Sequence, residues 1–252
     1  MQGNEDVWLF DLLRGGVTRF TFNAAIDRRP VWSPDGTQIL FNSNQKAAYD
    51  LYTKPSSGAG TYQLVLESPY TKTPYSWSAD GRFLLYGEND PKTPSDLWAL
   101  PMQGDRKPVP VVANTPFFEG TAEFSPNGRW VAYQSNESGR LEAYVVPFPS
   151  GSGKWQISTA GGIEPRWRHD GKELFFIAPD AKMMAVAVSA SGTSFEAAPP
   201  VALFQTSIVG GGTNTLKHQY AVSADGRFLI NVSVGDSPGP ITLILNWKPQ
   251  AK

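Results

Sequence analysis

Short runs of apolar and β-branched residues recur along the chain, and polar residues separate them. Clear examples are QILFNS at 38–43 and RFLLYG at 82–87. Runs of this length and composition are typical of β-strands, because branched and aromatic side chains pack well on a pleated surface. No apolar stripe with a 3.6-residue period extends beyond two turns, which is the pattern a helix would need. The sequence therefore predicts an all-β protein.

A turn phrase precedes each of the clearest runs. Its best copy is WSPDG at Trp32–Gly36, where proline presets φ, aspartate caps its own backbone and glycine takes a positive φ. Five copies occur, and their glycines lie 45, 47, 43 and 55 residues apart. The copies are Trp32–Gly36, Trp77–Gly81, Phe124–Gly128, Trp167–Gly171 and Val222–Gly226. A near-constant period indicates a repeat architecture.

Two further strand-like runs follow most copies of the phrase. The first copy, for example, is followed by DLYTKP at 50–55 and YQLVLE at 62–67. Each repeat then holds about four antiparallel strands in ~45 residues, the size of a propeller blade. We expect the tryptophan of the phrase to pack between neighbouring blades. A sandwich and an open solenoid are the alternatives, and neither explains the recurring turn phrase as directly.

The repeat resembles the WD-like propeller repeat of TolB, of the tricorn protease and of prolyl oligopeptidase relatives. The resemblance rests on Trp-Ser-Pro-Asp-Gly, an apolar strand and an Asp-Leu-Tyr or Asp-Leu-Trp strand, and it covers nearly the whole chain. It is closest to propellers at the C-terminal end of bacterial serine/threonine kinases and to their stand-alone relatives, whose last strand is similar to Ile241–Trp247. The fourth copy departs from the pattern at Arg168 and His169, and the fifth lacks the leading aromatic residue.

The ends of the chain are predicted to complete one blade together. Val7–Leu12 and Val17–Phe22 read as two outer strands, and Gln219–Ser223 with Arg227–Ser233 read as the missing inner pair. Pairing the ends would close the ring and remove exposed sheet edges. This arithmetic favours five blades, and the extra strand at Ile241–Trp247 leaves six as the alternative.

Composition narrows the class of protein without naming its function. The chain has 252 residues, 40% of them apolar, which suits a single propeller domain over 1–252. A net charge of −1 argues against nucleic acid as a partner. We expect a monomer with no membrane span. No signal peptide is visible in the chain as written, so the expected location is cytoplasmic, although the native compartment is left open.

Known catalytic motifs are missing from the sequence. It has no G-x-S-x-G elbow, no H-E-x-x-H and no Walker loop, and it has no cysteine. One acid stands just before the third strand of each repeat, and we interpret these acids as structural. They are Asp6, Asp50, Asp96 and Glu142.

The segments that lead into the inner strands are the predicted site. In a propeller these segments meet at one mouth of the central channel, so residues distant in sequence converge there. Their side chains are mostly polar and differ from repeat to repeat, whereas a packing role would favour similar residues. The predicted ligand-binding residues are Asp27, Arg28, Arg29, Lys72, Glu119, Glu164, Arg166 and Lys217.

Two hypotheses of function follow. The preferred one is a non-catalytic scaffold that binds a protein, peptide, glycan or small molecule at the channel mouth, with no cofactor. The alternative is a calcium-dependent hydrolase similar to propeller lactonases, in which Asp27, Glu119 and Glu164 hold one calcium ion and His218 is the general base. A simpler interpretation pairs these acids with Arg28, Arg29, Lys72 and Lys217 as ion pairs.

Overall fold

The computed structural model describes residues 5–149, 152–213 and 218–232. The chain divides into two compact units, Met1–Pro116 and Phe117–Lys252, and each is described by itself. The predicted single propeller domain over 1–252 stays a prediction. The predicted strand Ile241–Trp247 and residue Lys217 lie outside the described residues.

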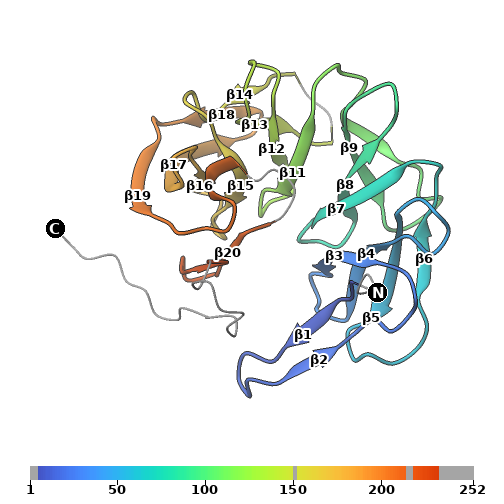
Figure 1. Cartoon of the computed structure of the whole chain (residues 1–252). Helices are drawn as coiled ribbons and strands as arrows, with labels where there is room; N and C mark the ends of the chain where they lie inside the picture. Colours follow the sequence, from blue (N-terminus) through green and yellow to red (C-terminus); the bar gives the residue numbers. More distant parts are fainter. Residues whose placement is uncertain (1–4, 150–151, 214–217, 233–252) are drawn as a thin grey trace. The chain divides into compact units, whose positions relative to one another are not determined.

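Unit 1 contains one two-stranded and two four-stranded antiparallel sheets (Figure 1). Each four-stranded sheet is ordered as its strands follow in the chain, as in a propeller blade. Their bounds are β1 Trp8–Phe10 and β2 Val17–Arg19; β3 Asp27–Trp32, β4 Gln38–Ser43, β5 Asp50–Pro55 and β6 Gln63–Leu66; and β7 Thr71–Trp77, β8 Phe83–Asn89, β9 Asp96–Pro101 and β10 Val109–Val112.

Unit 2 repeats this plan with one irregular sheet. The sheet formed by β15 to β19 has five strands. Its long strand β17 pairs with β19 along its first part and with β18 near its end. The sequence did not predict strand β18. The bounds are β11 Glu119–Phe124, β12 Trp130–Ser135, β13 Glu142–Pro147 and β14 Trp155–Gln156; β15 Ile163–Trp167, β16 Glu173–Ile177, β17 Lys182–Ser191, β18 Ser194–Ala197 and β19 Val201–Gln205; and β20 Tyr220–Val222 and β21 Phe228–Ile230. A short 3-10 helix spans Gly211–Thr213.

The turn phrase is a hydrogen-bonded lock between the first two strands of a sheet. In the second copy the Ser78 hydroxyl donates to Asp80 at 2.7 Å and accepts from the backbone N–H of Phe83 at 2.9 Å. The first and third copies make the same pair of bonds, and so does the fifth. In the fourth copy Arg168 replaces serine and binds Glu173 at 2.7 Å, which explains how this turn dispenses with the hydroxyl.

Replacing Ser78 by alanine should lower the free energy of unfolding by about 1–2 kcal/mol, because the buried N–H of Phe83 then loses its acceptor. The bond from Ser78 is also the largest cause of the lowered pKa of Asp80, about 2. A depressed pKa means that this stabilisation is present at neutral pH and is lost as the pH falls through about 2.

Urea unfolding of wild type and Ser78→Ala measures the effect. Asp80→Asn is the control, since Asn127 has this role in the third copy, and a cost for Ser78→Ala as small as the control's would contradict the lock.

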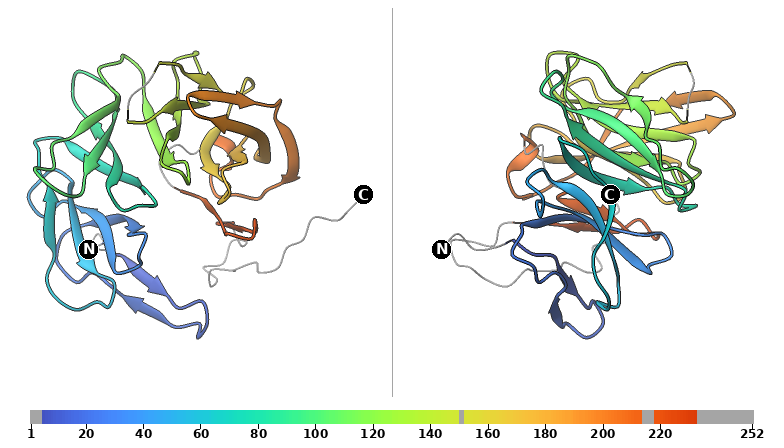
Figure 2. Two further views of the ribbon diagram at one scale, coloured as in Figure 1. Left: turned by 180° about the vertical axis from the view of Figure 1, so that it is seen from behind. Right: turned by 90° about the vertical axis from the view of Figure 1, so that its right-hand side faces the viewer.

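Apolar cores lie between successive sheets within each unit. Figure 2 shows the backbone of these sheets from two further sides. Trp77 packs against a core formed by Leu40 and Leu51 of one sheet and Leu84 and Leu100 of the next. Trp167 is 5% exposed, in a core shared by β12 and β16. The predicted packing of the phrase tryptophan between blades is confirmed at these two positions.

Trp32 contradicts that prediction, because its side chain is 52% exposed. The reason is local: β1 and β2 pack on the β3–β6 sheet through Val7 and Phe20, which contact Phe41, and leave Trp32 outside this core. Trp32, Trp77 and Trp167 hold the same position in the repeat, and their side chains are nevertheless buried to different extents.

The two terminal strand pairs form separate two-stranded sheets among the described residues. β1 pairs with β2, and β20 pairs with β21, and both pairs are antiparallel, as expected for blade strands. They belong to different units. Closure of the ring through a shared blade and the count of five or six blades stay predictions.

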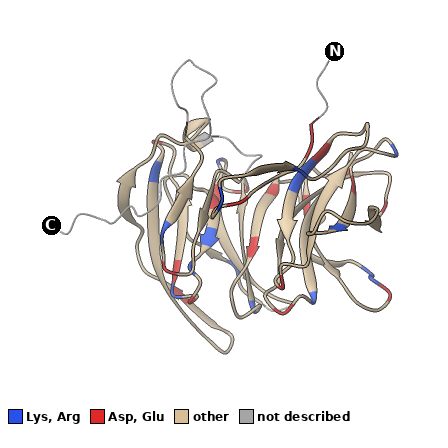
Figure 3. Ribbon diagram, turned by 90° about the horizontal axis from the view of Figure 1, so that it is seen from below, with Lys and Arg blue, Asp and Glu red and all other residues tan. Residues whose placement is uncertain are grey.

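Acidic and basic residues are interspersed along the strands and loops of both units (Figure 3). This distribution agrees with the net charge of −1. Within the described ranges, no helix is long and apolar enough to cross a membrane.

Candidate functional site

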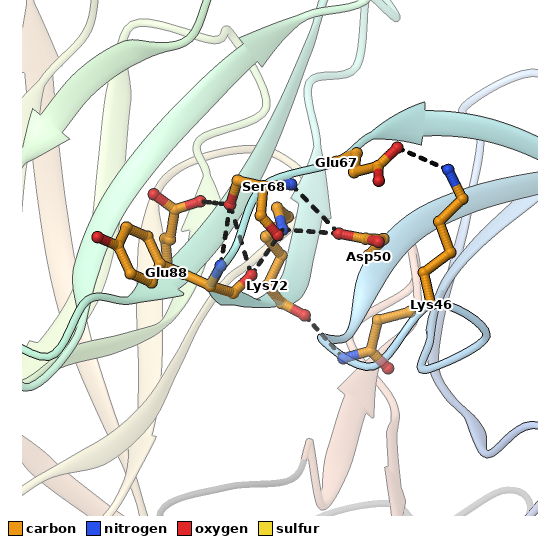
Figure 4. Close-up of polar contacts among 8 residues, drawn as sticks. Lys46, Asp50, Glu67, Ser68, Lys72 and Glu88 are labelled. Atoms are coloured by element: carbon orange, nitrogen blue, oxygen red, sulfur yellow. Dashed lines mark hydrogen bonds and ion pairs between the residues drawn. The ribbon is translucent and has the colours of Figure 1, made fainter.

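Lys72, a predicted ligand-binding residue, is fully buried at the start of β7 (Figure 4). Its ammonium donates to Asp50 Oδ1 at 2.8 Å and to the carbonyls of Ser68 and Tyr70 at 3.1 and 2.6 Å. An ammonium has three donors, so these bonds use all of them. Asn42 on β4 donates to the Lys72 carbonyl at 2.8 Å. Lys72 therefore joins the two four-stranded sheets of unit 1 and has no donor left for a ligand.

Two predicted arginines also bind acids within their own unit. Arg28 pairs with Glu5 (Nη2 to Oε1, 2.7 Å) and lies over the Tyr49 ring. Arg166 Nη1 lies 3.1 Å from Glu123 Oε1. Burial raises the pKa of Glu123, and the Arg166 charge opposes that rise. The sequence-based interpretation paired Arg28 and Lys72 with the predicted site acids, and it is wrong in these partners. Arg28 pairs with Glu5, and Lys72 pairs with Asp50.

Glu164 is 1% exposed and joins three strands of unit 2. Its N–H donates to Gln134 on β12 at 2.9 Å, and its Oε2 accepts from the Gln219 N–H at 2.7 Å. Its carbonyl accepts from the Tyr220 hydroxyl at 2.8 Å. Glu119, the first residue of β11, is equally buried. These acids therefore lie inside unit 2 and not on a solvated rim.

A β-bulge interrupts the first strand of each four-stranded sheet and of the five-stranded sheet near the predicted site. The register shifts in β3, β7, β11 and β15 alike. In three of them a non-glycine residue has a positive φ: Arg29 (57°), Thr121 (41°) and Glu164 (54°). Such residues cost of order 1–3 kcal/mol and are retained where the surroundings fix them. Proline lies at three of these register shifts, as Pro30, Pro74 and Pro165, and a proline inside a strand is confined to sheet edges and bulges. Sequence reasoning did not use this signal and missed the bulges.

The proposed calcium ligands do not lie in one unit. Asp27 begins β3 in unit 1, whereas Glu119 and Glu164 belong to unit 2. Among the described residues, no group of three histidine or acidic side chains forms a metal site. His218 is half-buried at the start of the last described segment. The calcium cluster and the catalytic role of His218 stay predictions.

The acids that precede the third strands are structural, as predicted. Asp50 and Lys72 form the buried pair described above, and Asp96 accepts from the N–H of Asn114 at 3.0 Å. Glu142 accepts from the Ser158 hydroxyl and from the Gly161 N–H. Asp6 pairs with Arg19 at 2.7 Å. Each acid therefore anchors a neighbouring loop or strand.

The larger hollows lie at the opposite strand ends, between successive turn phrases. The first turn groove, about 500 Å³, lies between the β3–β4 and β7–β8 turns and the segment after β9. The second, about 440 Å³, lies between the β11–β12 and β15–β16 turns and the end of β17. The first is lined by Ser33, Pro34, Asp35, Thr37, Gln38, Trp77, Ala79, Asp80, Gly81, Met102, Gln103 and Arg106. The second is lined by Ser125, Pro126, Asn127, Trp130, Trp167, Asp170, Gly171, Lys172, Val188, Ser189 and Ala190.

The two turn grooves are equivalent in the repeat. In each, the Ser-Pro-Asp or Ser-Pro-Asn turn of one sheet faces the tryptophan and the Asp-Gly turn of the next sheet. Both volumes fall in the range of small-ligand pockets, roughly 300–1,000 Å³. Neither lining contains a histidine. Hydrogen bonds from Ser33 and Ser78 are the main cause of the lowered pKa values of Asp35 and Asp80. Both acids are therefore ionised, and both already accept hydrogen bonds within their own turns. The grooves can bind a ligand but contain no histidine base.

Sequence reasoning placed the site at the other strand ends and missed these grooves. The sequence did contain a signal for the grooves. When a turn phrase recurs at a constant period, the surface between two neighbouring turns recurs as well. We interpreted the phrase only as turn chemistry.

Two curated relatives match part of the chain. An uncharacterized peptidase, YuxL of Bacillus subtilis, is 24% identical over 165 residues, which is 52% of this chain and 25% of the relative. Tricorn protease homolog 1 of Streptomyces coelicolor is 28% identical over 149 residues, or 54% of this chain and 14% of the relative. The match thus spans a quarter or less of each relative's length. No family model matches the chain.

Solved structures share the fold over most of the chain. TolB from Acinetobacter baumannii has a TM-score of 0.69 at 15% identity and covers 91% of this chain and 54% of its own. A TolB-like protein from Agrobacterium tumefaciens has a TM-score of 0.67 at 19% identity, with coverage of 88% and 80%. A puromycin-hydrolysing peptidase from Mycobacterium tuberculosis has a TM-score of 0.62 at 17% identity, with coverage of 86% and 38%. The chain has a TolB-like β-propeller fold.

Proposed function

We propose that the chain is a non-catalytic binding domain, and that it holds an extended polypeptide segment in its turn grooves. The observation that carries the proposal is the equivalence of the two grooves, which present the same wall of turn, tryptophan and Asp-Gly turn in separate units. A polypeptide offers apolar side chains together with backbone donors and acceptors. Each groove offers an apolar wall together with charged and amide side chains, so the chemistries match.

The relatives support a polypeptide over other ligands. Two are named as a peptidase and a protease homolog, and one solved neighbour is a peptidase. Their chains extend well beyond the matched region, so a binding role for this part is compatible with chemistry elsewhere in those proteins. The support from the two curated relatives is sequence similarity over part of the chain, and the support from the solved structure is similarity of fold.

The test begins with selection of peptides from a random displayed library on the purified chain, followed by calorimetry of the best binder. Gln103→Ala in the first groove and Lys172→Ala in the second should each weaken binding by roughly 5–30-fold, the effect of losing about 1–2 kcal/mol. Both residues are exposed, so the fold should tolerate the changes.

Lys46→Ala is the matched control. Lys46 is an exposed lysine in the β4–β5 loop, at the strand ends away from the turns, and it pairs only with Glu67 on the surface. The affinity of the Lys46→Ala variant for the peptide should stay within about twofold of wild type. Failure to select any peptide, or wild-type affinity in both groove variants, would count against the proposal. A glycan array run in parallel shows whether sugars bind instead.

The hydrolase hypothesis is the second candidate, and the peptidase names of the relatives favour it. In its calcium-dependent form, Asp27, Glu119 and Glu164 would hold the ion and His218 would be the base. The binding-domain proposal predicts no turnover of peptide or lactone substrates by this chain, with or without calcium. Turnover that Glu119→Gln and His218→Ala both abolish would support the hydrolase.

A further inference from the structure

In unit 1, a residue at the start of each inner strand, Asp27 in β3 and Lys72 in β7, lies beside the acid of the preceding repeat. The N–H of Asp27 donates to the carbonyl of Glu5 at 2.9 Å, and the N–H of Lys72 donates to that of Tyr49 at 2.8 Å. The residue after each acceptor is an acid, Asp6 in one case and Asp50 in the other. The two places are therefore equivalent in backbone geometry.

The charge at these equivalent places is balanced in different ways. At the second place, the buried Lys72 ammonium neutralises Asp50. At the first place, the residue that corresponds to Lys72 is Asp27, which is itself an acid. Asp6 there is paired with Arg19 at 2.7 Å. No ion pair reaches Asp27 from any of the described residues, in contrast to Asp50.

Asp27 is 1% exposed, and neither of its carboxylate oxygens accepts a hydrogen bond of normal geometry. Ser43, its cross-strand partner on β4, is fully buried, and its hydroxyl also makes no hydrogen bond. The side chains of Ser43, Thr21 and Asn23 lie near enough to oppose the rise in the pKa of Asp27 that burial causes, and the Asp6 charge adds to that rise. The Ser43 and Thr21 hydroxyls and the Asn23 amide thus lie close to the Asp27 carboxylate, which accepts no hydrogen bond of normal geometry from them.

We propose that unit 1 binds a hard cation in this oxygen cage, with Asp27 and Ser43 as ligands and Asp6 and Thr21 beside them. Carboxylate and hydroxyl oxygens are the ligands that such cations take. A proton on Asp27 would pair one carboxyl oxygen with the Ser43 hydroxyl and leave the second carboxyl oxygen unpaired. One cation satisfies both carboxyl oxygens and the hydroxyl together. It would have the role that the Lys72 ammonium has at the equivalent place. This site is independent of the turn grooves, and it uses neither Glu119 nor Glu164.

Thermal unfolding in ion-free buffer tests the proposal directly. The protein is chelated, exchanged into tetramethylammonium buffer and titrated separately with calcium, sodium and potassium. The binding ion should raise the Tm by roughly 5–10 °C when its free concentration is 100-fold above Kd. Calorimetry with the same ion gives the stoichiometry, which should be one.

Three kinds of variant locate the ion. Asp27→Asn should lose the rise in Tm, and Asp27→Lys, which supplies a tethered ammonium as Lys72 does, should also be insensitive to the ion. Asp6→Asn should weaken the ion's binding, which provides a second variant if the Asp27 changes do not fold. Asp105→Asn, an exposed acid of the same unit, is the control and should respond like wild type.

Glu119→Gln and Glu164→Gln separate this cage from the calcium cluster predicted from sequence, because the cage should keep its ion in both. No response of the wild type to any of the three cations would overturn the proposal. An unchanged response in Asp27→Asn would overturn it as well. Either failure leaves the peptide-binding test in the grooves unaffected.

Discussion

Replacement of Lys72 by methionine should lower the free energy of unfolding by about 3–5 kcal/mol. The change leaves the Asp50 carboxylate, which is 2% exposed, without its ammonium partner. It also removes the donor that serves the carbonyls of Ser68 and Tyr70. An unpaired buried charge is unfavourable because it has lost its hydration and no opposite charge compensates for that loss. Urea unfolding measures the difference.

Two further variants make this result specific. Lys72→Met combined with Asp50→Leu should recover much of the loss, since apolar groups can replace a buried ion pair at little cost. Lys46→Met breaks the exposed pair with Glu67, whose side chains are 51% and 50% exposed, and should cost roughly 0–1 kcal/mol. A cost for Lys72→Met no larger than for Lys46→Met would show that the pair does not hold the two sheets together.

Alanine at Trp167 should cost about 3–5 kcal/mol, whereas alanine at Trp32 should cost less than about 1 kcal/mol. Both residues begin a copy of the turn phrase, but Trp167 is 5% exposed and Trp32 is 52% exposed. Trp167 also meets Phe195 edge to face, with ring centroids 6.3 Å apart, and its Nε1 donates to the Glu123 carbonyl at 3.3 Å.

Chemical unfolding of the two variants side by side provides the comparison. The two tryptophans share a repeat position, although Arg168 and His169 replace Ser33 and Pro34 in the turn after Trp167. Each substitution leaves its own turn sequence intact, so its cost reports what packs on that tryptophan. Equal costs would contradict the burial described for unit 2 or the exposure of Trp32 in unit 1.

The strands were predictable because their pattern is local. The predicted runs at 50–55 and 96–101 coincide with β5 Asp50–Pro55 and β9 Asp96–Pro101. Strand β18 was missed because its sequence, SFEA, follows Ser191–Gly192 and reads as part of a loop. A short hairpin of this kind is fixed by its partner β17, which sequence periodicity does not reveal.

The candidate site was less predictable because it depends on contacts between repeats. The alignment placed Asp27 and Lys72 at one repeat position, but only the structure shows that Asp50 lies against Lys72. The predicted rim is largely buried for the same reason, since Glu119 and Glu164 are each 1% exposed. The positive φ at Arg29 was also missed, although Pro30, the next residue, marks a bulge inside the strand.

The structure of the chain bound to its best selected peptide tests the central claim most directly. The account predicts that the peptide lies against the turn phrases, in contact with the groove walls that contain Trp77 or Trp167. A peptide bound instead at the opposite strand ends, beside the segments that lead into the inner strands, would contradict it and restore the site first predicted from sequence.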